Sequence, residues 1–140
     1  MLPERTWQSL ATIDVLVYPG GRGVMMQLGD EQVRGRLREL AAGGALMTSV
    51  CTGALAYADA GLLNDRPATT HWRALDDLAA LGDRVNVRPD ERFVDSGEVI
   101  TAAGVSAGID MALQLIVRLH SLERAREVRR QIQYDLEPPV

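Results

Sequence analysis

The fold of this 140-residue chain is restricted most strongly by the alternation of continuous apolar runs with segments of helical periodicity. The runs IDVLVY (13–18) and ALMTSV (45–50) resemble strands that are buried on both faces. Between them, Val33, Leu37 and Leu40 recur at helical spacing, and Gly43-Gly44 follows as a helix terminator. Strands that alternate with helices form parallel sheets covered by helices on both faces. The sequence therefore predicts an α/β protein with a mostly parallel sheet.

The remaining segments continue this pattern within one domain of residues 1–140. A helix is expected from Thr52 to near Gly61, and a short strand in RPATTH (66–71) is followed by a helix in residues 72–82. Two strands are expected around a turn at residues 95–97. Two further helices are expected, an apolar one from Val105 and a charged one in residues 122–132.

The carboxyl edge of the predicted sheet gathers residues that can do chemistry. Ligands of open α/β sheets bind at this edge. Four loops are expected there, at residues 19–23, 51–52, 71–72 and 103–108. They carry the only cysteine, Cys51, one of the two histidines, His71, and two glycine-rich stretches. The convergence predicts a site.

Cys51 falls at the predicted turn from a strand into a helix. Such a turn projects a nucleophile into a cleft, often with a strained backbone. The positive end of the following helix would favour the thiolate over the thiol. The amides of Thr52 and Gly21 could bind a developing negative charge, and a glycine allows backbone to approach a ligand closely. The alternative, an inert buried thiol, is the commoner state of a lone cysteine, but the position at the turn favours a nucleophile.

Composition excludes several classes of function. A net charge of −4 gives no basic surface for nucleic acid or an anionic membrane. All fifteen basic residues are arginines, so no lysine can form a Schiff base or hold pyridoxal phosphate. The first ten residues lack the apolar core of a secretory signal, and one thiol cannot form an intrachain disulfide. We expect a cytoplasmic protein that acts on a small molecule without a metal or cofactor.

Four segments together resemble the ThiJ/PfpI superfamily, and the similarity runs from Ile13 to Pro139. They are VLVYPGGRG, SVCTGALAYADAGLLNDRPATTHW, FVDSGEVITAAGVSAGIDMALQL and QIQYDLEPP. The branch they resemble most is that of isonitrile hydratase and the sensor-like domains of AraC-type regulators. The resemblance implies a flavodoxin-like three-layer sandwich with a nucleophile elbow.

The resemblance also implies roles for individual residues. Cys51 matches the elbow nucleophile, Thr52 the neighbour that assists it, and Gly20 and Gly21 the glycine pair that lines the pocket. His71 matches a histidine near the cysteine in several branches, although it could equally be a partly buried histidine that caps the strand end. Because Thr52 stands where protease-like members carry histidine, a peptidase dyad is disfavoured. Asp110 of the AGID pattern lies one turn into its helix, and we interpret it as structural.

The chain departs from the family pattern at its amino end. Family members normally carry a strand, a helix and a second strand before VLVYPGG, and this unit supplies an acid beside the cysteine. Only twelve residues precede Ile13 here, and neither Glu4 nor Asp14 is a convincing replacement. We therefore expect an N-terminally incomplete sheet whose exposed edges favour a homodimer or a larger assembly.

Three functions follow from these observations. The first is a cysteine-dependent hydratase or lyase that resembles isonitrile hydratase and adds its thiolate to a small electrophile. The second is a non-catalytic ligand-sensing domain. The third is an inactive truncated homologue, or a protein-quality factor with an oxidisable thiol. We favour the first of the three.

Overall fold

A computed structural model describes residues 6–134 and contains a four-stranded sheet at its centre. The strands are β1 (Val15–Tyr18), β2 (Leu46–Val50), β5 (Phe93–Asp95) and β6 (Val99–Ala102), in the order β1-β2-β6-β5. β1, β2 and β6 are parallel, whereas β5 runs antiparallel to β6. The predicted mostly parallel α/β sheet is confirmed, and the carboxyl ends of β1, β2 and β6 lie at one edge.

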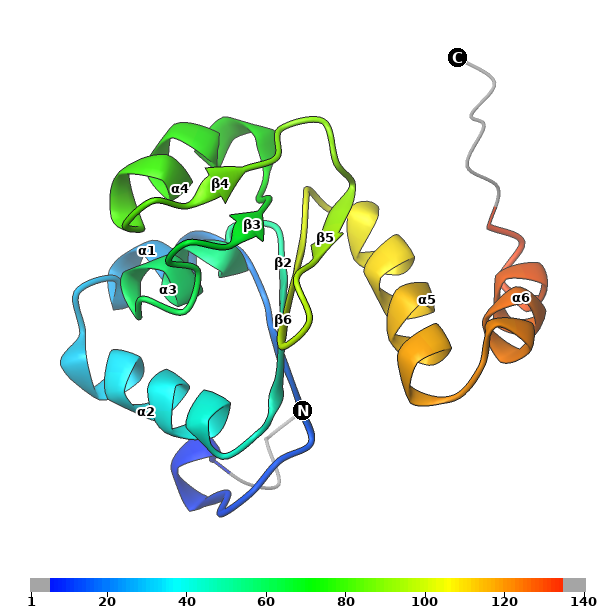
Figure 1. Cartoon of the computed structure of the whole chain (residues 1–140), viewed down its shortest axis with the longest axis horizontal. Coiled ribbons are helices and arrows are strands. Elements are labelled where there is room, and N and C mark those ends of the chain that lie inside the picture. The colour runs from blue at the N-terminus through cyan, green and yellow to red at the C-terminus, as the bar shows by residue number, and fades with distance from the viewer. Residues whose placement is uncertain (1–5, 135–140) are drawn as a thin grey trace.

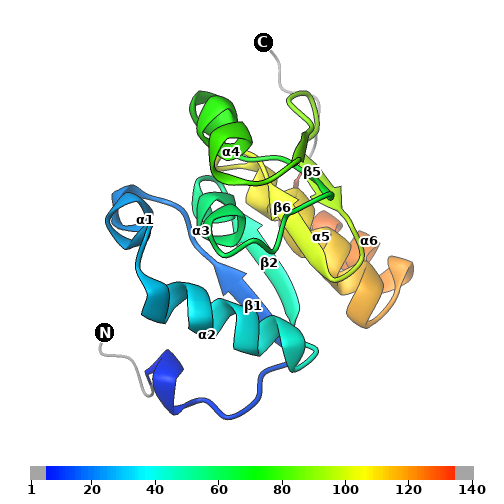
Figure 2. The same ribbon diagram turned by 60° about the vertical axis from the view of Figure 1, so that its left-hand side comes forward.

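Helices cover both faces of this sheet, as expected (Figure 1). On one side lie α1 (Arg22–Gln27), α2 (Glu31–Ala42), α3 (Gly53–Asp59) and α4 (Leu75–Leu81). On the other side lies α5 (Ala107–Leu119), against which α6 (Leu122–Gln131) packs. Two 3-10 turns, η1 (Trp7–Ser9) and η2 (Trp72–Ala74), complete the helical elements of the described residues. Figure 2 shows α2 and α3 lying across the near side of the sheet, with α5 behind it.

The larger part of the apolar core lies between the sheet and α2, α3 and α4. Helix α3 is central to it, because every residue from Gly53 to Ala58 is buried. Its alanines let it approach the sheet and its neighbours closely, while Leu55 and Tyr57 are fully buried. A smaller cluster joins β6 to α5 through Ile100, Ala102, Ala107 and Met111.

The expected helix of residues 31–42 forms with its predicted face inward, since Val33, Leu37 and Leu40 are buried. Asp30 begins it by accepting a hydrogen bond from the Gln32 amide at 2.9 Å.

Three elements differ from expectation. The short strand β3 (Pro67–Ala68) pairs with β4 (Asn86–Val87) in a separate parallel sheet and takes no part in the central one. Proline cannot donate to a ladder, and the next residue but one, Thr69, donates its amide to the hydroxyl of Thr101. Helix α1 falls in a segment for which no element was expected. The helix expected from Val105 begins at Ala107, because Val105 adopts a left-handed φ of 41°.

In the described part of the chain, no helix has the length and apolar character required to cross a bilayer.

Candidate active site

Cys51 occupies the turn between β2 and α3 in a strained conformation. Its φ of 57° lies in the left-handed region that non-glycine residues rarely adopt. The amide of Cys51 donates to the carbonyl oxygens of Ala102 and Ala103, both at 3.0 Å, so contacts with β6 continue to the turn itself. Cys51 is a free thiol of intermediate exposure. The predicted strand-to-helix turn with a strained backbone is confirmed.

The glycine loop that follows β1 closes on this turn. A Cβ added to Gly20 would lie 2.8 Å from both the Cβ of Cys51 and the amide nitrogen of Thr52. At Gly53, an added Cβ would collide with the carbonyl oxygen of Tyr18 at the end of β1. Both positions therefore exclude a side chain, and the glycine loop after β1 packs directly on the elbow.

Thr52 is joined directly to the glycine loop. The Gly21 amide donates to Oγ1 of Thr52 at 2.9 Å. Gly21 has a φ of 118°, which favours glycine whatever the available space. Because its N–H is already paired, a bound anion would have to displace the Thr52 hydroxyl to reach it. The shared anion site of the Thr52 and Gly21 amides stays a prediction.

His71 begins the turn η2 and caps it with its ring. Its Nδ1 accepts a hydrogen bond from the Arg73 amide at 3.2 Å, so the neutral ring carries its proton on Nε2. The ring stacks on Trp72, whose own face lies 4.8 Å from the guanidinium carbon of Arg73. The ring therefore caps the turn η2 that follows and not the strand end that was expected, while a role in catalysis stays a prediction.

His71 also contacts the loop that binds the elbow. A Cβ on Gly104 would lie 2.7 Å from Cδ2 of the histidine ring. Gly104 follows Ala103, whose carbonyl accepts the Cys51 amide. The segment Ala103-Gly104 thus contacts both the elbow and His71, although these residues are far apart in the sequence.

Thr70 is a site residue that the sequence did not single out. Its hydroxyl donates to the carbonyl oxygen of Cys51 at 2.8 Å, and its exposed fraction is 1%. Thr70 lies in the segment expected to form a short strand. In the sequence, only its position next to His71 in the ATTH run distinguishes it.

Three acidic residues were discussed from the sequence: Asp110 as a structural residue, and Asp14 and Glu4 as possible replacements for the family acid. Asp110 accepts from Nε of Arg92 at 2.7 Å and from the Tyr134 hydroxyl at 3.1 Å, which supports its structural interpretation. Asp14 precedes β1 at the amino end of the strand, opposite the elbow. Glu4 lies outside residues 6–134. Within that range, no hydrogen bond of Cys51 involves a carboxylate, and no cluster of three His, Cys, Asp or Glu side chains could hold a metal.

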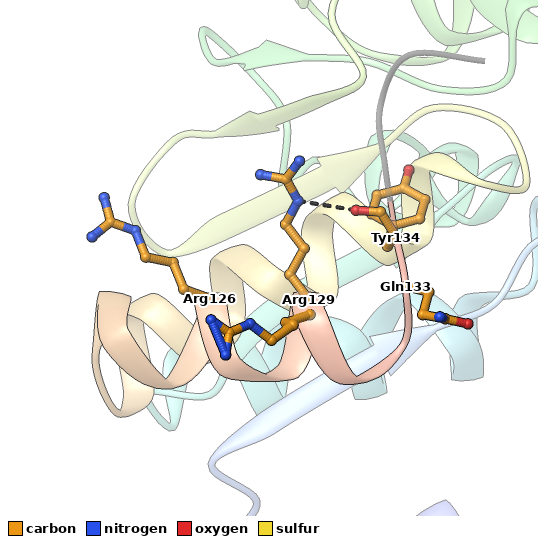
Figure 3. A pocket seen from close by; sticks show the side chains of 5 residues that line it. Arg126, Arg129, Gln133 and Tyr134 are labelled. Carbon is orange, nitrogen blue, oxygen red and sulfur yellow. Dashed lines mark hydrogen bonds between the residues drawn. The ribbon is translucent and has the colours of Figure 1, made fainter. Parts of the chain in front are cut away.

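Two cavities differ in their relation to the glycine loop that faces Cys51. One of about 400 Å³ opens beside Gly20 and is lined mostly by apolar groups. Its lining residues are Trp7, Tyr18, Pro19, Gly20, Gly23, Val24 and Gln27. A larger one of about 590 Å³ lies along α6 and shares no residue with the elbow (Figure 3). Cys51 lines neither cavity, and we place the candidate site there because its strained turn meets the glycine loop at Gly20.

Comparison with known proteins identifies the family of this chain. The model of the DJ-1/PfpI family matches residues 1–118. The chain belongs to the DJ-1/PfpI family. The resemblance to ThiJ/PfpI proteins in the sequence is thereby confirmed.

Individual DJ-1/PfpI relatives are similar over most of this chain but are themselves longer. Isonitrile hydratase of Pseudomonas putida is 39% identical over 98% of this chain and 59% of its own length. The transcriptional regulator CdhR of Pseudomonas aeruginosa is 38% identical over 68% of this chain and 28% of its own. A ThiJ/PfpI protein of Pseudomonas syringae superposes with a TM-score of 0.85 at 31% identity, over all of this chain and 57% of that structure. This chain therefore spans less than two thirds of each of these relatives.

Proposed function

We propose that this domain is a cysteine-dependent hydratase that acts on a small electrophile of the isonitrile type. The observation that supports it most is the strained elbow at Cys51, with φ of 57°, against the glycine loop at Gly20. Strain of this kind is typical of catalytic turns, since the surrounding structure has to maintain it. The 39% identity to an isonitrile hydratase suggests the substrate class.

The proposed reaction adds one water molecule to the isonitrile R–NC. The Cys51 sulfur forms a bond to the terminal carbon, and the proton lost by the thiol is returned to that carbon, which gives a thioimidate. Water then adds to the same carbon, the carbon–sulfur bond breaks, and the thiol recovers its proton. The product is the N-substituted formamide R–NH–CHO. No electrons enter or leave, so the reaction needs no redox cofactor.

The other site residues take supporting roles in this proposal. Thr52 contacts the glycine loop through its hydroxyl, and we expect that hydroxyl to bind the attacking water. Gly20 and Gly21 form the facing wall. His71, which carries its proton on Nε2 when neutral and contacts the loop at Gly104, is the candidate acid–base residue. An acid–base residue at such a site contributes about 10²–10⁴-fold to the rate.

The test is turnover of a small alkyl isonitrile to its formamide, measured by chromatography. Cys51→Ala should abolish turnover while leaving the melting temperature close to that of the unaltered chain, since loss of one sulfur costs little packing. Thr52→Val should slow turnover with little effect on stability. Turnover that persists in Cys51→Ala would rule out the nucleophile.

A second candidate is a ligand-sensing domain, which is supported by the 38% identity to the regulator CdhR. A sensor would bind a small molecule without consuming it. Binding of a formamide or isonitrile that raises the melting temperature equally in Cys51→Ala and in the unaltered chain, with no product formed, would favour this function.

The expected partners of the chain follow from the same proposal. We expect a small-molecule substrate and a homodimer or larger assembly, and we expect the protein to work in the cytoplasm. An inactive homologue is the outcome if neither turnover nor ligand binding is detected.

A further inference from the structure

The backbone of Cys51 is hydrogen-bonded through both its N–H and its carbonyl oxygen. On the amide side, the N–H donates to the carbonyls of Ala102 and Ala103. On the carbonyl side, the oxygen accepts the Thr70 hydroxyl at 2.8 Å. These two interactions bracket the φ and ψ rotations of a single residue, so together they oppose relaxation to an ordinary conformation.

We propose that Thr70 is a positioning residue, whose hydroxyl holds the Cys51 carbonyl and thereby keeps the nucleophile in its left-handed conformation. The proposal rests on the proposed role of Cys51 but on no particular substrate. A left-handed non-glycine residue persists only where its surroundings enforce it. Loss of the Thr70 hydroxyl removes one of the groups that do so and leaves a partly buried carbonyl without this donor.

The neighbouring threonine provides a matched control within the same segment. Thr69 is as buried as Thr70, with an exposed fraction of 0% against 1%. The Thr69 hydroxyl has no hydrogen-bond partner among the described residues, and only its backbone amide is bonded, to Thr101. Valine has the shape of threonine without the hydroxyl, so the same substitution at the two positions isolates the bond to Cys51.

The decisive readout is the second-order rate of Cys51 alkylation by iodoacetamide in the native protein, measured from pH 6 to 9 and well below the melting temperature. We expect Thr70→Val to lower this rate by about fivefold to tenfold, the factor that corresponds to one ordinary hydrogen bond. We expect Thr69→Val to leave the rate and its pH profile unchanged. Thr70→Ser, which keeps a hydroxyl, should restore most of the rate.

Two outcomes would overturn the proposal: a rate in Thr70→Val that equals or exceeds that of Thr69→Val, or a rate in Thr70→Ser as low as in Thr70→Val. If Thr70→Val does not fold, Thr70→Ser and Thr70→Ala are compared instead, since they differ only in the hydroxyl, and equal rates in that pair would overturn the proposal. The alkylation assay needs no turnover. If the hydratase proposal fails, the assay still shows whether Thr70 positions Cys51.

Discussion

At the scale of single residues, the reaction proposed for Cys51 depends on how closely other backbone segments approach that residue. The glycine loop touches the elbow at Gly20, and the histidine ring touches Gly104. Both contacts are possible only because the glycines lack a side chain. The sequence predicted that the glycine-rich loop and Cys51 meet at one edge of the sheet, because each follows a buried strand. It did not predict Gly53, Gly104 or Thr70, because contacts between distant segments leave no periodic signal.

Gly20→Ala should disturb the elbow itself. The added methyl would lie 2.8 Å from the Cys51 Cβ, so backbone must shift, and we expect the free energy of unfolding to fall by about 1–3 kcal/mol. The native alkylation rate of Cys51 should change with it. Gly23→Ala is the control, because an added Cβ there meets nothing within 4 Å. Thermal unfolding and alkylation that are the same in both variants would show that the loop does not shape the elbow.

At the scale of elements, the helix that follows the Cys51 turn is anchored by an ion pair at its far end. Asp59, the last residue of α3, accepts from Nε and Nη2 of Arg34 on α2, at 2.8 and 2.6 Å, and from the Gly29 amide at 2.9 Å. Hydrogen bonding by Arg34 lowers the pKa of the Asp59 carboxyl below its ordinary value. The ion pair and the Gly29 bond join the end of α3 to α2 and to the loop before it.

Asp59→Asn should lower the free energy of unfolding by about 1–2 kcal/mol, because charge-assisted bonds to a nearly buried carboxylate are lost. The pKa of Asp59 is lower in the folded chain, so its stabilisation is complete above the unfolded value of about 4 and is lost as the pH falls through the folded value. Urea unfolding at pH 7 and below pH 4 measures both effects. The exposed pair of Asp65 and Arg84 has similar geometry, so Asp65→Asn should change stability little. Equal losses from the two substitutions would contradict the anchoring role.

Helices and strands could be predicted from the sequence where apolar residues recur at regular spacing or form a continuous run. Val33, Leu37 and Leu40 identified α2, and the apolar runs identified β1 and β2. Helix α1 was not predicted from the sequence. It is short, and Met25 and Met26 are exposed, so its apolar residues do not form one buried face. The separate pairing of β3 with β4 was not predicted, because two residues are too few to show the alternation that identifies a strand and its partner.

At the scale of the whole molecule, the central sheet has an unpaired edge among the described residues. β1 pairs with β2 on one side, and no described strand pairs with its other side. Val17 in β1 is 52% exposed, although a strand of this type is usually buried. An edge with unpaired backbone groups and an exposed apolar side chain favours association with another chain.

We therefore expect light scattering to report a dimer or larger species. Val17→Arg should shift it toward the monomer, because a charge on an edge strand opposes strand pairing. Met26→Arg is the control, since Met26 is 87% exposed on α1 and is not part of the edge strand. A monomer for the unaltered chain, or an equal effect of both substitutions, would contradict association through β1.

The central claim, that Cys51 is a covalent nucleophile, is tested most directly by intact-mass spectrometry of protein quenched in acid during reaction with a small alkyl isonitrile. The account predicts a population heavier by the mass of one isonitrile, with the added mass on the peptide that contains Cys51 and none in Cys51→Ala. Formamide produced without that adduct, or the same adduct in Cys51→Ala, would contradict it.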